Sequence, residues 1–200
     1  MQVPQKIDVF ITGVGGQGVV LASDVLAQVG LDAGFDVKKT DSLGMAQRGG
    51  SVVSHVRLAD KVFSPLIPEG GADFLLSFER LEAVRSLRFL KQGGVAIVDT
   101  AAVQPLSVVN EGYHYPTSDE VRNALLSTAG SLHLVPALEI ATGIGNPRAA
   151  SILCLGFLSA FLDIPQDVWL DQIKKQLPPR LHPVNLAAFA EGLRLARARQ

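Results

Sequence analysis

Apolar and polar positions in the first part of the chain follow the pattern of a strand, a helix and a second strand. Residues 7–12 are rich in Ile, Val and Phe, and residues 19–33 place apolar side chains at helical spacing. Gly34 marks the expected end of that helix, and residues 35–40 again resemble a strand. We therefore expect the chain to begin with a strand–helix–strand unit whose two strands pair in parallel.

The next segment departs from this pattern. Residues 51–58 alternate and turn at 59–61 into a short apolar run at 62–64, which predicts a β-hairpin. The later expected elements are strands at 74–78, 95–99 and 132–135, and helices at 81–90, after a cap at Ser118, at 148–162, from Pro165, and at 184–199. The pattern predicts a single α/β domain over residues 1–200. It would be a three-layer α/β/α sandwich with a mostly parallel, Rossmann-like sheet and a helical C-terminal third.

Composition agrees with one globular domain. The 200 residues are 48% hydrophobic and 18% charged, the balance of a chain that buries a core rather than one that stays disordered. There are 18 Lys and Arg residues and 19 Asp and Glu residues, so the formal net charge is −1. Because the chain has no basic excess and no run of like charges, we do not expect nucleic acid as a partner.

Three features bear on the cellular compartment. Cys154 is the single cysteine, which excludes a disulfide framework and a cysteine-ligated iron–sulfur cluster held by this chain alone. Asp8 interrupts the N-terminal apolar run before it reaches the length of a secretion signal. The apolar segment at residues 152–162 is about half as long as a stretch that spans a bilayer. We expect a cytoplasmic protein without a membrane span.

A glycine-rich turn lies between the first expected strand and helix. It reads Gly-Val-Gly-Gly-Gln-Gly over residues 13–18 and matches GxGxxG in the context where that motif has a mechanical role. Glycines let a phosphate approach the backbone amides, and the positive end of the following helix favours an anion. The candidate residues for a pyrophosphate are Gly13, Gly15, Gly16, Gln17 and Gly18. The alternative is a turn that needs glycine only for its backbone angles.

Basic residues after this unit influence the choice of nucleotide. A dinucleotide-binding unit that prefers NAD places an acidic residue at the end of its second strand, whereas here that position holds Lys38 and Lys39. The lysines favour a phosphorylated ribose, as in NADP or coenzyme A, with solvated surface lysines as the alternative. Arg48 follows in a glycine-rich loop with Gly49 and Gly50 and can clamp a phosphate or carboxylate.

The chain resembles the gamma-type subunits of the 2-oxoacid:ferredoxin oxidoreductases, especially the indolepyruvate-type beta subunit and the third domain of pyruvate:ferredoxin oxidoreductase. The resemblance covers about two thirds of the sequence in the family's order. It rests on VGGQGVV at 14–20, GMAQRGGSVVSHVR at 44–57, SPLIPEGGAD at 64–73, the helix at 79–90 with its following glycine pair, and NPR at 146–148.

The resemblance implies a subunit of a complex that decarboxylates a 2-oxoacid oxidatively, forms acyl-coenzyme A and reduces ferredoxin. Thiamine diphosphate, magnesium and iron–sulfur clusters would then reside on partner subunits, and this chain would contribute to coenzyme A binding and assembly without a catalytic residue or metal ligand. Ser54, His55 and Arg57 would join the glycine turn at the coenzyme A site. Without its partners, the chain could pair with a second copy through its apolar C-terminal helices.

The substrate and two other functions remain open. Residues 40–43 read Thr-Asp-Ser-Leu, where indolepyruvate-type subunits commonly read Ser-Glu-Val-His, which leaves pyruvate, 2-oxoglutarate, branched-chain and aryl 2-oxoacids as candidates. An NADP-dependent reductase would explain the glycine turn with its lysines. A purely architectural subunit would use the same turn for packing.

Overall fold

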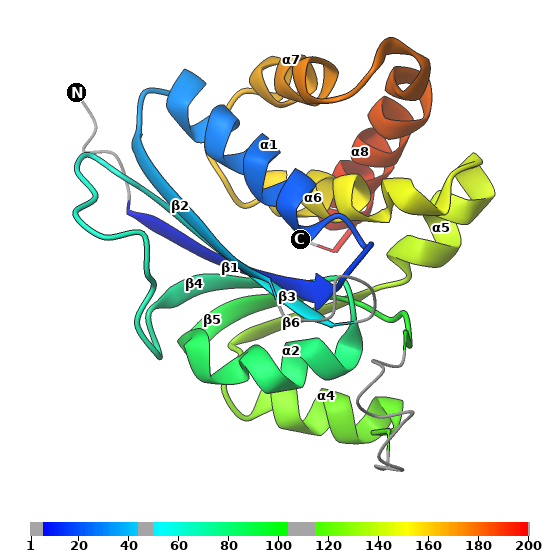
Figure 1. Cartoon of the computed structure of the whole chain (residues 1–200). Coiled ribbons are helices and arrows are strands. Elements are labelled where there is room, and N and C mark those ends of the chain that lie inside the picture. Colours follow the sequence, from blue (N-terminus) through cyan, green and yellow to red (C-terminus); the bar gives the residue numbers. More distant parts are fainter. Residues whose placement is uncertain (1–5, 44–49, 104–114, 200) are drawn as a thin grey trace.

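A computed structural model describes residues 6–43, 50–103 and 115–199, and its centre is a six-stranded sheet between helical layers (Figure 1). The strands are β1 (Ile7–Val14), β2 (Asp36–Leu43), β3 (Ser51–Ala59), β4 (Ala72–Ser77), β5 (Leu90–Asp99) and β6 (Ser131–Val135). Their order across the sheet is β2-β3-β1-β4-β5-β6. The pairs β1–β4, β4–β5 and β5–β6 are parallel, whereas β3 is antiparallel to both of its neighbours.

The arrangement of the strands differs from the expectations in two places. β2 does not pair with β1, because β3 lies between them and bonds to both. The expected strand at residues 62–64 does not form either. There, the amide of Val62 donates to Asp36 Oδ2 (2.9 Å) and the carbonyl of Ser64 accepts from Arg57 Nη1 (3.1 Å). Side chains, rather than a neighbouring strand, satisfy this part of the backbone.

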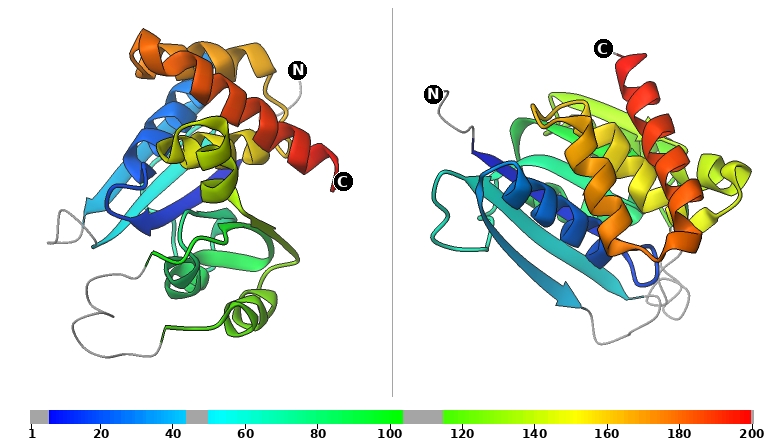
Figure 2. Two further views of the ribbon diagram at one scale, coloured as in Figure 1. Left: turned by 90° about the vertical axis from the view of Figure 1, so that its right-hand side faces the viewer. Right: turned by 90° about the horizontal axis from the view of Figure 1, so that it is seen from above.

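Helices cover both faces of the sheet, so the expected three-layer α/β/α architecture is confirmed (Figure 1). One face carries α1 (Val19–Asp32), α5 (Ala137–Ile144), α6 (Ala150–Ser159), α7 (Gln166–Gln176) and α8 (His182–Arg197), and the other carries α2 (Arg80–Ser86) and α4 (Ser118–Leu126). Short 3-10 turns occur at Leu87–Phe89, Pro147–Ala149 and Pro179–Leu181. Within the first layer, α7 packs on α1 and α8 packs on α6 (Figure 2).

Two helix details differ from the expectations. The helix α5 was not expected from the sequence pattern, and the cap of α4 is Thr117 rather than Ser118. Thr117 Oγ1 accepts from the amide of Glu120 (3.2 Å), and the Glu120 carboxylate accepts from the amide of Thr117 (2.7 Å). This reciprocal pair satisfies two backbone donors, which a cap one residue later would not do.

The apolar helix α6 is buried by the chain itself. All ten of its residues are buried, between the sheet and α8. Gly156 and Gly192 allow the two helices to approach closely, because a Cβ on either would lie within 2.0 Å of the other helix's backbone. The apolar residues of α6 therefore pack inside the chain, while pairing with a second copy through the C-terminal helices stays a prediction. In the described residues, no helix is long and apolar enough to cross a membrane.

Candidate functional site

The glycine turn lies at the carboxyl end of β1, where the fold changes direction. β1 leads into α1 on one face of the sheet, and its neighbour β4 leads into α2 on the other (Figure 1). In open α/β sheets, ligands bind at the carboxyl ends of the strands where the connections part in this way. The sequence prediction of a strand, glycine turn and helix thus places the turn at the position that this fold class uses for ligands.

Backbone angles explain two of the glycines. Gly16 and Gly18 have φ values of 101° and 85°, in the left-handed region that side-chain-bearing residues rarely adopt. Gly18 also caps α1 and lies against α6, since a Cβ there would be 2.7 Å from Ser151 Oγ. A Cβ on Gly16, by contrast, would meet no atom of the described residues within 4 Å. The space above Gly16 is open to a ligand, whereas the space at Gly18 is filled by the protein.

Gln17 organises the turn from within. Its Oε1 accepts from the amide of Val14 (2.7 Å), and its Nε2 donates to the carbonyl of Phe78 after β4 (2.8 Å). The amide of Gly15 donates to the carbonyl of Gly50 (2.9 Å). Among the described residues, no acceptor meets the amides of Gly16 and Gly18, which precede the first turn of α1. These two amides and the helix end are the part of the turn that can hold an anion.

We expect Gln17→Ala to lower the free energy of unfolding by about 1–3 kcal/mol, because it removes the side-chain hydrogen bonds to Val14 at the end of β1 and to Phe78 after β4. Urea unfolding measures the change. The control is Gln176→Ala, which truncates an exposed glutamine at the end of α7 and should leave stability unchanged. Equal unfolding midpoints for the two variants would show that Gln17 does not organise the turn.

A second helix begins beside the turn. Ser151, in the first turn of α6, is fully buried, and within the described ranges its hydroxyl has no hydrogen-bond partner. Just before it, Asn146 Oδ1 accepts from the amide of exposed Arg148 (3.0 Å) in the NPR segment. The positive ends of α1 and α6 therefore meet at Gly18 and Ser151. Two converging helix ends strengthen the attraction of this region for an anion.

Buried carboxylates line the neighbouring strand end, and the sequence analysis did not single them out. Glu79 follows β4, where its Oε2 accepts from the amide of Glu82 (2.9 Å) and its Oε1 accepts from the hydroxyl of Tyr115. Burial raises the pKa of Glu79. Glu82 accepts from Ser51 Oγ (2.6 Å) and pairs with Arg85 (2.7 Å). Glu79 and Glu82 are three positions apart, which is the spacing of a capping pair at the start of a helix. This spacing could have identified the two residues from the sequence.

Asp99 ends β5 and caps α5. Its Oδ1 accepts from the amide of Ala137 and its Oδ2 from the amide of Leu138, both at 3.1 Å. Burial raises the pKa of Asp99 to about 6, while the hydrogen bonds from backbone amides oppose the shift. The cap comes from a residue 38 positions away along the chain.

The raised pKa of Asp99 predicts a pH effect on stability. As the pH falls through 6, folded protein takes up a proton that the unfolded chain, with a carboxyl pKa of 3.8, does not yet bind. This contribution is complete below pH 3.8 and is lost as the pH rises through 6. We expect the unfolding free energy of the wild type, relative to Asp99→Asn, to rise by about 2 kcal/mol between pH 7.5 and pH 4.5. Urea titrations at both pH values test this, and a constant difference would contradict it.

The other predicted site residues differ in where they lie relative to the turn. Gly50 contacts it, whereas Arg48 and Gly49 lie outside the described residues. Ser54 is fully buried on the α1 face of β3 and donates to Asp41 (2.5 Å). Exposed Lys38 pairs with Asp36 (2.9 Å).

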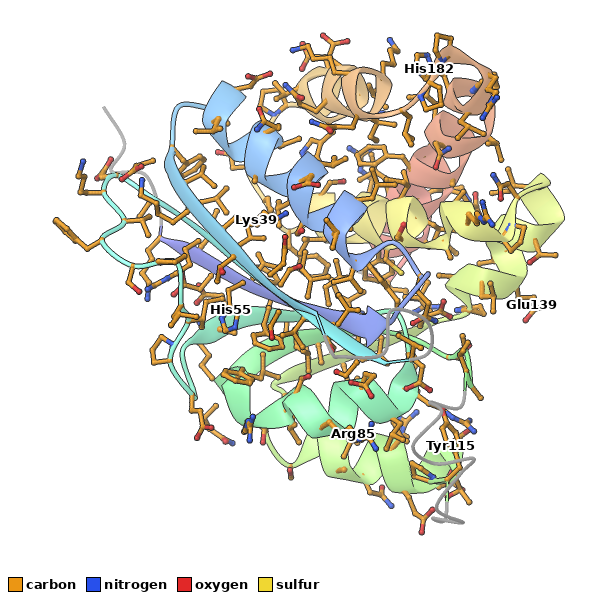
Figure 3. The ribbon with its side chains drawn as sticks, in the orientation of Figure 1. Lys39, His55, Arg85, Tyr115, Glu139 and His182 are labelled. Carbon is orange, nitrogen blue, oxygen red and sulfur yellow. The ribbon has the colours of Figure 1, made fainter. Side chains whose placement is uncertain are left out.

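His55 and Arg57 lie on the opposite face of β3 and toward its far end. Ser51 pairs with Val14 beside the turn, and Arg57 pairs with Asp8 at the start of β1. Six residues along a strand span about 20 Å. Figure 3 shows His55 toward the end of the sheet where the chain begins, away from Tyr115. The geometry therefore separates His55 and Arg57 from the glycine turn.

The second strand also bears on the nucleotide. Lys39 pairs with Asp41 (2.9 Å) and Asp24, so its charge is neutralised by the protein. Because β3 separates β2 from β1, the end of β2 lies about two strand spacings, roughly 10 Å, from the glycine turn. In a dinucleotide-binding unit these strands are adjacent. This arrangement disfavours NADP bound in the Rossmann manner.

Comparison with known families identifies the chain. The sequence profile of the family described as pyruvate ferredoxin/flavodoxin oxidoreductase matches residues 8–195. The chain belongs to this family. Family members that resemble it include the indolepyruvate oxidoreductase subunit IorB of Thermococcus kodakarensis, 33% identical over 196 residues, covering 96% of this chain and 97% of the relative. The IorB subunit of Archaeoglobus fulgidus is 34% identical over 189 residues, covering 94% of each chain.

Solved structures from the family share the fold. The gamma subunit of a keto/oxoacid ferredoxin oxidoreductase from Geobacter sulfurreducens aligns with a TM-score of 0.70 at 23% identity, over 96% of this chain and 99% of the other. A 2-oxoglutarate:ferredoxin oxidoreductase from Magnetococcus marinus, solved with 2-oxoglutarate, coenzyme A and succinyl-CoA, aligns with a TM-score of 0.75 at 18% identity. The alignment covers 97% of this chain and 31% of that one. The chain is thus a subunit of a 2-oxoacid:ferredoxin oxidoreductase, an oxidoreductase complex.

Proposed function

We propose that this subunit holds the pyrophosphate of coenzyme A at the glycine turn while partner subunits oxidise the 2-oxoacid. The partners would carry thiamine diphosphate, magnesium and the iron–sulfur clusters, and would pass the electrons to ferredoxin. In the overall reaction, the carboxylate leaves as carbon dioxide and the acyl group joins the sulfur of coenzyme A. The role of this chain is then to position one reactant, which lowers the entropic part of the barrier.

The observation that carries the proposal is the open space over Gly16 at the N-terminus of α1. Among the described residues no acceptor meets the amides of Gly16 and Gly18, and the ends of two helices add positive potential. The Magnetococcus marinus protein of the same fold was solved with coenzyme A and succinyl-CoA. Both compounds carry the diphosphate that such a turn suits.

The relatives favour an aryl 2-oxoacid as the substrate of the complex. Four curated relatives at 32–34% identity are indolepyruvate oxidoreductase subunits, whereas the 2-oxoglutarate synthase subunits are 26–27% identical. The substrate would bind to the thiamine-bearing partner. Steady-state rates of the purified complex with indolepyruvate and 2-oxoglutarate test this assignment, and a preference for 2-oxoglutarate would overturn it.

Calorimetric titration of coenzyme A into the assembled complex tests the binding role. Gly16→Ala places a methyl group in the open space and should weaken coenzyme A binding at least tenfold. The matched control is Gly34→Ala after α1, where φ is 89° and a Cβ also meets no atom within 4 Å in the part of the chain that the structure describes. Both variants carry similar backbone strain, but only Gly16 faces the proposed ligand. Unchanged affinity in Gly16→Ala would contradict the proposal.

A further inference from the structure

The loop between β3 and β4 presents two large apolar side chains to solvent. Phe63 is 90% exposed and Leu66 is 59% exposed, more than any other large apolar side chain in the described residues. They lie three positions apart on one loop, on either side of Pro65. Single exposed apolar residues are common, but two neighbouring ones form a patch that a partner can cover.

Side chains of β3 bind the backbone of the same loop through hydrogen bonds. Arg57 Nη1 donates to the carbonyls of Ser64 (3.1 Å) and Leu66 (3.0 Å). His55 Nδ1 accepts from the amide of Ile67 (3.1 Å). Burial lowers the pKa of His55, as does the nearby charge of Arg57, so the ring nitrogen is free to accept. A loop fixed in this way loses little conformational entropy when it binds.

A buried ion pair fixes Arg57 in turn. Its Nε donates to Asp8 Oδ1 (2.9 Å) and its Nη2 donates to Asp8 Oδ2 (3.1 Å), while the Asp8 side chain is 1% exposed. All three guanidinium nitrogens are therefore committed to Asp8 or to the loop. His55 and Arg57, which the family resemblance assigned to the coenzyme A site, bind the backbone of the loop that carries Phe63 and Leu66.

A basic hollow adjoins Phe63. It has a volume of about 270 Å³, and the side chains of Lys6, Arg57 and Lys61 line it. Asp8 is the carboxylate in its lining, and Asp8 already pairs with Lys6 (2.9 Å) and Arg57. The hollow therefore has an excess of positive charge beside an apolar anchor. It is complementary to an acidic side chain flanked by apolar ones.

We propose that Phe63, Leu66 and the basic hollow form a docking surface for a partner subunit of the oxidoreductase complex, which inserts an acidic side chain between apolar neighbours. The proposal rests on the proposed function, because it takes the partner from that complex. A second copy of this chain fits less well, since a two-fold pairing through the same surface would bring two basic hollows together. The surface lies at the end of the sheet opposite the glycine turn (Figure 1).

The test measures binding of the purified partner subunits to the full-length chain by biolayer interferometry. Phe63→Ser should weaken binding at least tenfold, because exposed apolar anchors dominate such interfaces. Lys61→Glu should weaken binding and reduce its salt dependence. Leu126→Ser is the matched control, because Leu126 is 49% exposed on α4, and it should change the affinity less than twofold. Far-ultraviolet circular dichroism should be the same for all variants.

The possible outcomes distinguish the proposed docking surface from the proposed function. Partner subunits that bind Phe63→Ser as tightly as wild type would overturn the docking surface alone. A wild-type chain that binds no partner subunit would overturn both the surface and the proposed function. Self-association of the wild type that Phe63→Ser abolishes, measured by analytical ultracentrifugation, would assign the surface to a second copy instead. Complexes assembled with Phe63→Ser at high subunit concentration should bind coenzyme A as wild type does.

Discussion

Replacing Gly192 by Ala is expected to lower the free energy of unfolding by about 3 kcal/mol or more. A Cβ at this position would lie 1.9 Å from the carbonyl oxygen of Leu153, and one on Gly156 would lie 2.0 Å from that of Phe189. Both obstacles are helix backbone, so α6 and α8 would have to separate and open the layer that packs on the sheet. Urea unfolding followed by the fluorescence of Trp169 measures the loss, because this single tryptophan is buried near Phe189.

Gly143→Ala is the control for this prediction. Gly143 lies in α5, its φ is not positive, and a Cβ there would meet no atom within 4 Å among residues 6–43, 50–103 and 115–199. Alanine is favoured over glycine inside a helix by about 0.5–1 kcal/mol, so this variant should be as stable as wild type or slightly more stable. Equal unfolding midpoints for Gly192→Ala and wild type would show that the two helices do not cross as closely as described.

Arg57→Met should destabilise the fold by about 3 kcal/mol. The substitution leaves the buried Asp8 carboxylate with Lys6 as its ion-pair partner, and it releases the two loop carbonyls that Arg57 holds. A buried carboxylate that loses its guanidinium is costly because the remaining partner, the largely exposed Lys6, compensates its charge only in part. Urea unfolding at pH 7 gives the magnitude.

A second substitution, added to Arg57→Met, tests whether the charge of Asp8 causes the loss of stability. Asp8→Asn combined with Arg57→Met should recover part of the lost stability, since it removes the buried charge that Lys6 compensates only in part. Arg194→Met, which breaks the exposed pair with Glu191 on α8, should leave stability unchanged. If Arg57→Met behaved like Arg194→Met, Asp8 and Arg57 would not form the buried pair described here.

Hydrophobic patterning predicted the layers of the fold but not the neighbours within the sheet. Alternation in residues 51–58 shows which side chains share a face, and the structure agrees that this segment is a strand. The alternation does not show which strands lie beside residues 51–58, because any neighbouring strand is compatible with it. The insertion of β3 between β1 and β2 depends on contacts between residues that are far apart in the sequence. The cap that Asp99 provides for α5 is equally non-local, so a short helix containing Gly143 gave no recognisable signal.

For the candidate site too, local features could be predicted from the sequence and long-range contacts could not. The glycine turn could be located because its features are local: a strand, left-handed glycines and a helix start. Ser54, His55 and Arg57 were grouped with it because the family resemblance implies a coenzyme A site that includes them. Strand geometry separates them, since alternate residues face opposite sides and each residue advances about 3.3 Å. The pairing of Arg57 with Asp8 could not be inferred without the sheet register.

Hydrogen–deuterium exchange on the assembled complex, with and without coenzyme A, tests the central claim most directly. The account predicts slower exchange at the amides of residues 16–21, where the turn meets α1, and no change over residues 55–67 at the opposite end of the sheet. Protection confined to residues 55–67, with residues 16–21 unchanged, would contradict it.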